Sequence, residues 1–364
     1  MYKYIPDNIF IGRNCLAQNS GLLNLGKKAL IVTGANSALK SGAQTDVVRA
    51  LEGLGIEWIV YNKIGENPLV SVCYEGGRIA AESGCDFVIG IGGGSPIDAA
   101  KAIAAYAANP KIAPSDVFGA LENALLPIIA VPTTAGTGSE ANPYGVLTID
   151  ETNTKKTFKD KASYPQYAFV DPRYLTSLSP YYLISCALDA ICHCIESYLS
   201  PKSNPCSEEA ALEGAAILYR ALMELRNSPL NDALADELMY GATLGGVAID
   251  VTGTGFPHPC GYNITLNEGV PHGRATAAFT GIFLDMNEEV APERCARLYK
   301  AIGAAGDEIK SSITAMAEVS CESSEEKWAR YKANISIAGN FQNSLRKVGE
   351  DEIIGIYRKV FPNK

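Results

Sequence analysis

The chain has 364 residues, a length that predicts two domains rather than a single core. Hydrophobic residues make up 47% and charged residues 20% of the chain, which is typical of a soluble globular protein. The 31 basic and 40 acidic residues give a net charge of −9 without a clustered basic stripe, so nucleic acid is not an expected partner.

The start of the chain and its apolar runs predict a cytoplasmic protein without a membrane partner. The start, MYKYIPDNIFIGRNC, lacks the charged region followed by an apolar region that marks a secretory signal. No apolar run reaches the roughly 18–20 residues that a membrane span needs. The ten cysteines show no paired zinc-ribbon spacing, and we interpret them as reduced, buried thiols.

The first half of the chain alternates short apolar runs with helical patterns. This alternation predicts βαβ units and a mostly parallel sheet, and the continuously apolar runs fit strands that are buried on both faces. The expected strands are residues 28–33, 57–61, 86–91 and 128–131, and the expected helices are residues 43–54, 70–83 and 97–108.

After residues 170–180 the pattern becomes helical, and no convincing strand follows. The expected helices are residues 187–198, 205–227, 232–250, 292–302, 307–319, 325–344 and 351–360. The predicted architecture is therefore an α/β domain with a Rossmann-like, mostly parallel sheet over residues 1–175, followed by an all-α domain over residues 176–364.

The segment IGIGGGSPIDAAKAIA, residues 89–104, predicts a phosphate-binding turn. A buried strand leads into three successive glycines, and we expect Ser95 to be the N-cap of the next helix, with Asp98 at the capping-box position. Glycine lets the backbone approach an anion, and a helix start offers free N–H groups with a partial positive charge. An ordinary strand-to-helix turn is the alternative, although such a turn needs one glycine rather than three.

A second loop, VPTTAGTGSE at residues 131–140, follows another expected strand. The hydroxyl groups of Thr133, Thr134 and Thr137 lie around two glycines and are suited to a diphosphate or a ribose. A loop without a ligand is the alternative interpretation.

The three histidines of the chain lie in positions that suggest a metal site. Asp189 and His193 are four residues apart and share one helix face. His258 and His272 lie in a stretch, GFPHPCGYNITLNEGVPHG, that glycine and proline prevent from forming one helix. One carboxylate and three imidazoles suit Fe²⁺ or Zn²⁺. Three neighbouring cysteines are rival ligands, of which the first two point off the Asp189 and His193 face: Cys192, Cys194 and Cys260.

Taken together, GGGSPIDAAKAIA, PTTAGTGSE, DAICHCIE and the two histidines ending in PHG resemble the iron-containing (group III) alcohol dehydrogenases of the dehydroquinate-synthase-like fold. The resemblance covers essentially the whole chain. It implies that the metal ligands are Asp189, His193, His258 and His272. It implies cofactor contacts from Asn67, Gly93, Gly94, Ser95, Thr133, Thr134, Thr137 and Lys155, with Lys156 as the alternative to Lys155. We also expect Gly34 and Asp98 among the cofactor-binding residues.

Two positions depart from the pattern of that family. Many members place a second histidine where this chain has Tyr262, and we expect this phenol to line the substrate side of the metal site as a candidate catalytic residue. Many members that use NAD end the first strand with an aspartate, where this chain has Gly34. Without a carboxylate to repel a 2′-phosphate, the sequence slightly favours NADP(H) over NAD(H).

The predicted activity is the transfer of a hydride between a nicotinamide cofactor and a small alcohol or aldehyde, with the metal acting as a Lewis acid. A homo-oligomer, specifically a dimer, is expected. Three alternatives stay open: a lyase resembling dehydroquinate synthase, a polyol enzyme resembling glycerol dehydrogenase, and a non-catalytic nucleotide-binding protein. The lyase requires a more basic substrate pocket, but residues 240–280 contain a single basic residue, Arg274.

Overall fold

The computed structural model describes residues 4–336 and 338–362. It divides into two compact units, one of Met1–Leu178 with Leu230–Thr243, and one of Ser179–Pro229 with Leu244–Lys364. The predicted boundary after residue 175 lies near the first of these divisions. Residues 230–243, which the sequence prediction places in the helical domain, group with the first unit instead.

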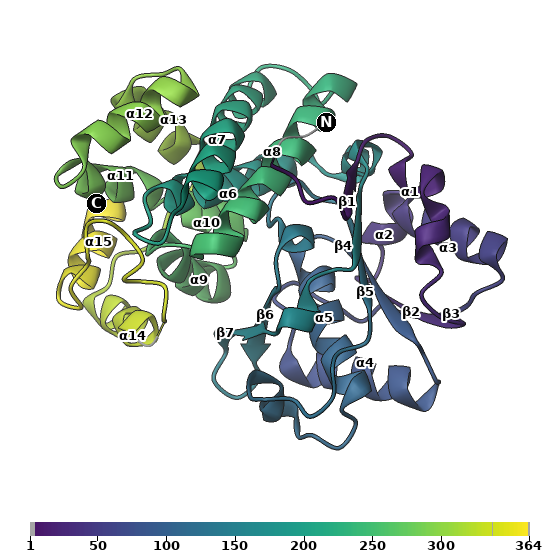
Figure 1. Cartoon of the computed structure of the whole chain (residues 1–364). Coiled ribbons are helices and arrows are strands. Elements are labelled where there is room, and N and C mark those ends of the chain that lie inside the picture. Colours follow the sequence, from purple (N-terminus) through teal and green to yellow (C-terminus); the bar gives the residue numbers. More distant parts are fainter. Residues whose placement is uncertain (1–3, 337, 363–364) are drawn as a thin grey trace. The chain divides into compact units, whose positions relative to one another are not determined.

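A six-stranded parallel sheet forms the centre of the first unit, in the order β1-β8-β5-β4-β2-β3 (Figure 1). The predicted parallel sheet is confirmed. Its strands are β1 (Ile9–Ile11), β2 (Lys28–Thr33), β3 (Glu57–Tyr61), β4 (Phe87–Gly92), β5 (Ile128–Pro132) and β8 (Tyr167–Val170). Its helices are α1 (Cys15–Gln18), α2 (Ser37–Lys40), α3 (Ala43–Leu54), α4 (Val70–Glu82) and α5 (Gly94–Ala108).

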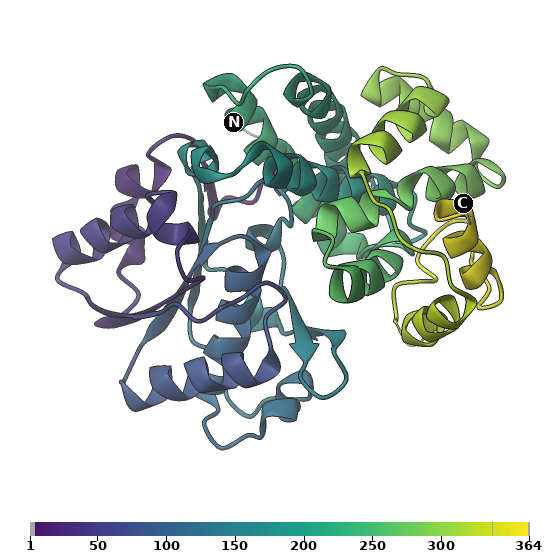
Figure 2. The same ribbon diagram turned by 180° about the vertical axis from the view of Figure 1, so that it is seen from behind.

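Both faces of the sheet are buried, which explains the continuously apolar strands. Leu30 and Val32 of β2 point into the core beneath α4 and α5, whereas Ala29 and Ile31 point into the core beneath α1 and α3. Figures 1 and 2 show these two pairs of helices on opposite sides of the sheet. Side chains that alternate in direction therefore meet apolar layers in both directions.

The strand order reverses between β2 and β4. From β2 the chain adds β3 on one side and then returns to add β4 on the other, with Thr33 paired to Ile91. In an open α/β sheet, ligands bind beside the carboxyl ends of the strands at such a reversal. Gly34 and the glycines after β4 follow these two strand ends.

An antiparallel hairpin of β6 (Tyr144–Ile149) and β7 (Thr154–Lys159) also belongs to the first unit. The sequence analysis did not predict this hairpin, nor β1 and β8. In β7, TKKTFK, only Phe158 is buried, so the strand has the composition of an exposed basic loop. Tertiary pairing with β6 decides its conformation.

The second unit is helical, as predicted, but its helices differ in number and length. Its helices are α6 (Pro180–Tyr198), α7 (Pro205–Leu225), α9 (Pro257–Glu268), α10 (His272–Ala277), α11 (Thr280–Glu288), α12 (Pro292–Ile302), α13 (Gly306–Ala317), α14 (Glu325–Ser336) and α15 (Glu352–Val360). Helix α8 (Asp232–Thr252) crosses the division at Thr243.

Three of these helices, α9 to α11, were not predicted. The helix predicted for residues 325–344 ends at Ser336, and residue 337 lies outside the described residues. Within the described part of the chain, no helix has both the length and the apolar character needed to cross a membrane.

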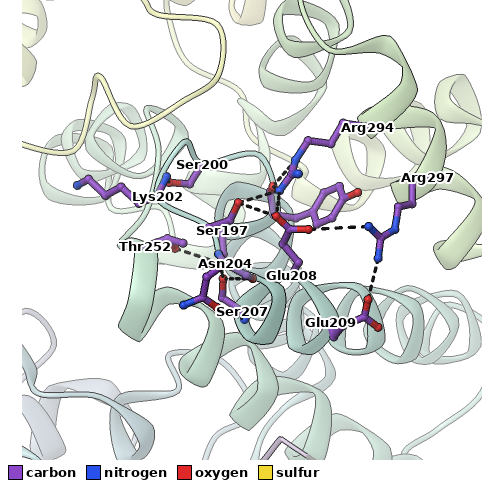
Figure 3. A network of polar contacts seen from close by, with 12 residues as sticks. Ser197, Ser200, Lys202, Asn204, Ser207, Glu208, Glu209, Thr252, Arg294 and Arg297 are labelled. Carbon is purple, nitrogen blue, oxygen red and sulfur yellow. Dashed lines mark hydrogen bonds and ion pairs between the residues drawn. The ribbon is translucent and has the colours of Figure 1, made fainter.

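Salt bridges fix the turn between α6 and α7. Figure 3 shows Arg294 and Arg297 of α12 directed toward Glu208 and Glu209 of α7, with N···O distances of 2.7 Å for Arg294–Glu208 and for Arg297–Glu209. Arg294 also donates to the carbonyl oxygen of Tyr198, the last residue of α6, at 2.9 and 2.6 Å. These contacts satisfy a carbonyl at the end of α6, the helix that carries Asp189 and His193.

Candidate metal centre

The structure brings the four predicted metal ligands together in the second unit. The Nε2 atoms of His193, His258 and His272 lie 3.8, 3.5 and 3.5 Å from Oδ1 of Asp189. The rings of His193 and His258 stack with their centroids 4.7 Å apart. Three imidazoles therefore converge on one carboxylate oxygen. The most distant of them, that of His272, is 83 positions from Asp189 in the chain.

This cluster is buried and has polar atoms without hydrogen bonds. Asp189, His193 and His258 are at most 4% exposed, whereas the side chain of His272 is 25% exposed and marks the open side of the cluster. Within the described residues, Oδ1 of Asp189 and Nε2 of His258 make no hydrogen bond. Leaving such atoms unsatisfied in a protein interior is costly, which indicates a missing ligand.

The charges within the cluster shift the pKa values of its side chains. Burial raises the pKa of Asp189, but the charges of His193, His272 and His258 outweigh burial and hold that pKa well below its usual range. Burial lowers the pKa of His258, but the charge of Glu196 and the contacts with Asp189 and Glu196 raise it to about 9.

Glu196 is a candidate functional residue that was not predicted from the sequence. It is 1% exposed, and its two carboxylate oxygens lie 2.8 and 2.9 Å from Nδ1 of His258. The backbone N–H of Gly255 donates to the same carboxylate at 2.7 Å. A carboxylate on Nδ1 directs Nε2 of a histidine toward a metal. The available signal was the spacing of Glu196, three residues after His193 in DAICHCIE, which places both near one helix face.

Proline and glycine set the positions of the two remote histidines. Pro257 opens α9, so that His258 is its second residue, and Gly269 ends this helix in the left-handed conformation at φ +68°. His272 then opens α10. The Gly/Pro pattern was correctly taken to exclude a single helix, but it marks the boundary between two helices rather than a loop.

Gly273 allows α10 to approach α6 closely. A Cβ atom at this position would lie 1.8 Å from the carbonyl oxygen of Ser185 and 2.9 Å from Cβ of Asp189. Only a residue without a side chain permits this contact, which carries His272 to the carboxylate of Asp189.

Tyr262 lies beside the open side of the cluster, with its ring centroid 5.3 Å from that of His272 and 6.2 Å from that of His258.

The rival cysteines are not part of the cluster. Among the described residues, the atoms that converge as possible metal ligands include no cysteine sulfur. Sγ of Cys192 instead lies 3.2 Å from Oγ1 of Thr280.

The donor set fits a divalent transition metal. Nitrogen and oxygen ligands about 2.1 Å from an ion in tetrahedral geometry are about 3.4 Å apart, close to the 3.5–3.8 Å separations measured from Asp189 Oδ1. Imidazole with carboxylate suits Fe²⁺ and Zn²⁺ equally.

In the first unit, the glycine turn after β4 (residues 92–94) packs against the threonine loop after β5 (residues 133–140). The N–H of Thr133 donates to the carbonyl of Gly92 at 2.8 Å. A Cβ atom on Gly94 would lie 2.6 Å from Cγ2 of Thr137, and one on Gly93 would lie 3.2 Å from Thr134. The glycines thus make room for the loop, a role that was not predicted from the sequence.

The predicted helix cap is wrong. Helix α5 begins at Gly94 with Gly93 as its N-cap, and no side chain caps it, so Ser95 is already inside the helix. The carboxylate of Asp98 accepts instead from the hydroxyl of Ser139 at 2.5 Å and from the N–H of Val146 at 3.0 Å. Tertiary partners compete successfully with the local cap because they satisfy both oxygens of this partly buried carboxylate.

The hairpin brings Asn67 and Lys155 to either side of β6. The N–H of Thr148 donates to the carbonyl of Pro68 at 2.8 Å, and Thr148 pairs with Lys155 across the hairpin. Asn67 has a left-handed backbone, with φ 54°. Successive strand residues point in opposite directions, so Lys155 and Lys156 face opposite sides, and Nζ of Lys156 lies 4.5 Å from the ring of Phe118.

The comparisons with known proteins agree with this geometry. Residues 6–172 match the family model for iron-containing alcohol dehydrogenase, and residues 183–330 match the model for the C-terminal part of the Fe-containing alcohol dehydrogenase family. A crystal structure of an iron-containing alcohol dehydrogenase from Thermotoga maritima is 30% identical, with a TM-score of 0.91 over 98% of each chain.

Two enzymes that differ in substrate are also similar. A 1,3-propanediol dehydrogenase of Klebsiella pneumoniae is 28% identical over 99% of each chain. A lactaldehyde reductase of Escherichia coli is 29% identical, over 76% of this chain and 72% of the relative.

Proposed function

The chain belongs to the iron-containing alcohol dehydrogenase family, and from this premise we propose that it moves a hydride between a nicotinamide cofactor and a small alcohol or aldehyde at the centre around Asp189. The class of activity, metal-dependent alcohol dehydrogenase or aldehyde reductase, follows from the family. The residues, the cofactor preference and the substrate are the proposal. The convergence of three imidazoles on one buried carboxylate oxygen carries it.

Four side chains would hold the ion: Asp189, His193, His258 and His272. The ion, when bound, supplies Lewis acidity toward the substrate oxygen. Glu196 keeps His258 in the tautomer whose Nε2 faces Asp189. His272 is the most exposed of the four, so substrate approaches from its side, where Tyr262 offers a hydroxyl for a hydrogen bond.

The first unit would hold the cofactor with backbone amides, hydroxyls and one ammonium group. The residues in this role are Gly34, Asn67, Gly93, Gly94, Ser95, Thr133, Thr134, Thr137 and Lys155. The free N–H groups at the start of α5 suit a diphosphate, and this helix begins next to the reversal of strand order. Asp98 was predicted to contact the cofactor. We propose instead that it supports the site indirectly, by accepting hydrogen bonds from Ser139 and Val146.

A lyase of the same fold is disfavoured by the contacts of Arg274. Its guanidinium is 2% exposed and donates to the carbonyl oxygen of Met316 at 2.7 Å and to the carboxylate of Glu318 at 2.8 Å. Arg274 therefore caps the C-terminal end of α13. Because its hydrogen bonds are used within the protein, the single basic residue of segment 240–280 is not placed to bind a phosphate-bearing substrate.

The direct test is the consumption of NADH and NADPH with a panel of short aldehydes. We expect activity that chelation abolishes and that Fe²⁺ or Zn²⁺ restores to the chelated enzyme. Activity that persists in protein shown by elemental analysis to be metal-free would contradict the proposal.

We also propose that the enzyme accepts NADP(H) and prefers it slightly. Gly34 follows the end of β2 at the reversal, where an acidic residue would repel a 2′-phosphate. Gly34→Asp should shift the ratio of kcat/KM toward NADH, whereas Gly34→Asn, of similar size but uncharged, should not. A Cβ at this position is 3.2 Å from the carbonyl of Ile64, so both variants require the same small adjustment. A tenfold preference of the unaltered enzyme for NADH would contradict this part of the proposal.

A cytoplasmic location and a homodimer complete the proposal. Seven of the ten cysteines are buried free thiols, which supports a compartment that keeps thiols reduced. Light scattering of the purified protein tests the dimer, and localisation of a tagged chain tests the compartment.

A further inference from the structure

Lys101 is a charged side chain that is fully buried in the first unit. It lies on α5 and is 0% exposed. Its Nζ donates to the carbonyl oxygen of Ser139 at 2.8 Å, to Oγ of Ser139 at 2.7 Å and to the carbonyl oxygen of Tyr144 at 2.7 Å. An ammonium group has three hydrogens, so these three acceptors satisfy it completely.

The acceptors belong to the segment that follows β5. Ser139 lies in the threonine loop, and Tyr144 begins the hairpin that carries Lys155. A buried charge is tolerated only when it is paired and hydrogen-bonded, so holding Lys101 in place requires this segment to keep its position.

Asp98 completes a directional chain of hydrogen bonds. Oγ of Ser139 accepts from Lys101 and donates its own hydrogen to Oδ1 of Asp98 at 2.5 Å. Oδ2 of Asp98 accepts from the N–H of Val146 in β6. Oδ1 of Asp98 is also 3.9 Å from Nζ of Lys101, so the carboxylate offsets the buried charge of Lys101. Each member has its donors and acceptors directed at the others, which makes the arrangement rigid.

The chain of contacts connects the parts of the proposed cofactor site. Helix α5 provides Gly94 and Ser95, and the loop provides Thr134 and Thr137. Gly94 and Thr137 are already in close steric contact, because a Cβ on Gly94 would lie 2.6 Å from Cγ2 of Thr137. A loop released from α5 would move its hydroxyl groups away from the amides at the helix start.

We propose that Lys101, Ser139 and Asp98 are positioning residues that lock the threonine loop and the β6–β7 hairpin onto α5 and so preorganise the site for the dinucleotide. Lys101 does not touch the cofactor; it acts through the loop. This inference rests on the proposed nicotinamide site and adds residues to which neither the family resemblance nor the comparisons give this role. Preorganisation of this kind lowers the cost of ordering a site when its ligand binds.

The test compares dinucleotide binding and loop exchange in Lys101→Met. Methionine keeps most of the length of the side chain and removes the ammonium group. We expect the Kd of NADH and NADPH, measured by nucleotide fluorescence, to rise about tenfold. At saturating cofactor kcat should stay within about threefold, and metal content should not change. In the cofactor-free protein, hydrogen exchange of residues 133–146 should become faster.

A matched control lies on the same helix. The hydroxyl of Tyr106 donates to the carbonyl of Pro114 at 2.5 Å, away from the threonine loop. Tyr106→Phe removes one buried hydrogen bond from α5 and should lower stability without raising the Kd.

Ser139→Ala is a milder second variant that removes only the hydroxyl, and Ser139→Thr should restore binding.

Two results separate the failure of this inference from the failure of the proposed function. An unaltered protein that binds neither dinucleotide would overturn the proposed function and this inference with it. An unaltered protein that binds, together with an unchanged Kd in Lys101→Met or, where that variant does not fold, in Ser139→Ala, would overturn this inference alone.

Discussion

The two units of this chain build their sites in different ways. In the first unit, the candidate cofactor residues follow the ends of adjacent parallel strands, as with Gly34 after β2 and Gly93 after β4. In the second, the candidate metal ligands come from three helices, α6, α9 and α10, and meet only because these helices cross closely.

This difference predicts different responses to mutation. A strand end is held by a sheet that many other residues support, so a local change there should alter affinity without removing the site. The metal centre depends on a few close helix contacts and on one carboxylate, so a single change there should affect metal content, activity and stability together. The following variants test this contrast in order of expected effect.

The largest effect is expected for His258→Ala. It removes one of three imidazoles around Asp189 and leaves the buried carboxylate of Glu196 with the N–H of Gly255 but without its imidazole partner. If the metal is lost, the transition state loses several kcal/mol of Lewis-acid stabilisation, which should lower kcat/KM by at least about 10³-fold. Elemental analysis should show lost metal while the Kd of NADH stays unchanged. Metal content equal to that of the unaltered protein would contradict the assignment.

Gly273→Ala should come next, although it changes no ligand. A methyl group 1.8 Å from the carbonyl of Ser185 must push α10 away from α6. We expect a loss of about 1–3 kcal/mol in the free energy of unfolding. Activity should fall about 100-fold because His272 moves with the helix.

The control for Gly273 is Gly355→Ala in α15, where a Cβ atom has open space. This variant should stabilise the protein by about 0.5–1 kcal/mol and leave metal content unaltered. Equal effects of the two variants in thermal unfolding and metal analysis would show that close packing at Gly273 is not the cause.

Glu196→Ala should weaken metal binding about 10- to 100-fold, because His258 loses the partner that sets its tautomer. Competition with a chelator measures this affinity directly. Glu196→Gln keeps an oxygen acceptor for Nδ1 and should recover part of the loss. Unchanged affinity in both variants would assign Glu196 to packing alone.

A smaller effect is expected at the glycine turn. Gly94→Ala places a methyl group 2.6 Å from Cγ2 of Thr137 and should raise the Kd of the dinucleotide about tenfold with metal content unchanged. Adding Thr137→Ser removes that methyl group and keeps the hydroxyl, so the double variant should bind better than Gly94→Ala. A double variant that binds worse would contradict steric contact as the cause.

The smallest effect is expected for Tyr262→Phe, which removes only the hydroxyl beside His272. If the phenol donates a hydrogen bond to substrate, kcat/KM for short aldehydes should fall by about 2- to 13-fold, in line with about 0.5–1.5 kcal/mol for such a bond. Metal content should stay constant. Identical kcat/KM across the aldehyde panel would leave Tyr262 as a packing residue.

Much of the fold was predictable because its signals are local. The apolar runs of β2, β4 and β5 and the helical periodicity between them predict a parallel sheet, and the structure confirms it. The proximity of Asp189 and His193 was also predictable from sequence, since a spacing of four residues places them on one helix face. The hairpin of β6 and β7 was not predictable in this way, because only Phe158 of β7 is buried and its pairing partner decides the conformation.

Local sequence patterns were enough to predict the two kinds of architecture, the glycine turn after β4 and the residue types of the candidate metal centre. Only the tertiary structure decided that Asp98 turns away from its helix cap toward Ser139, that Glu196 supports His258, and that Gly273 lets α10 meet α6. The reason is physical. Periodicity and spacing report which face of an element is buried, whereas the partner of a buried polar group depends on contacts between residues that are far apart in the chain.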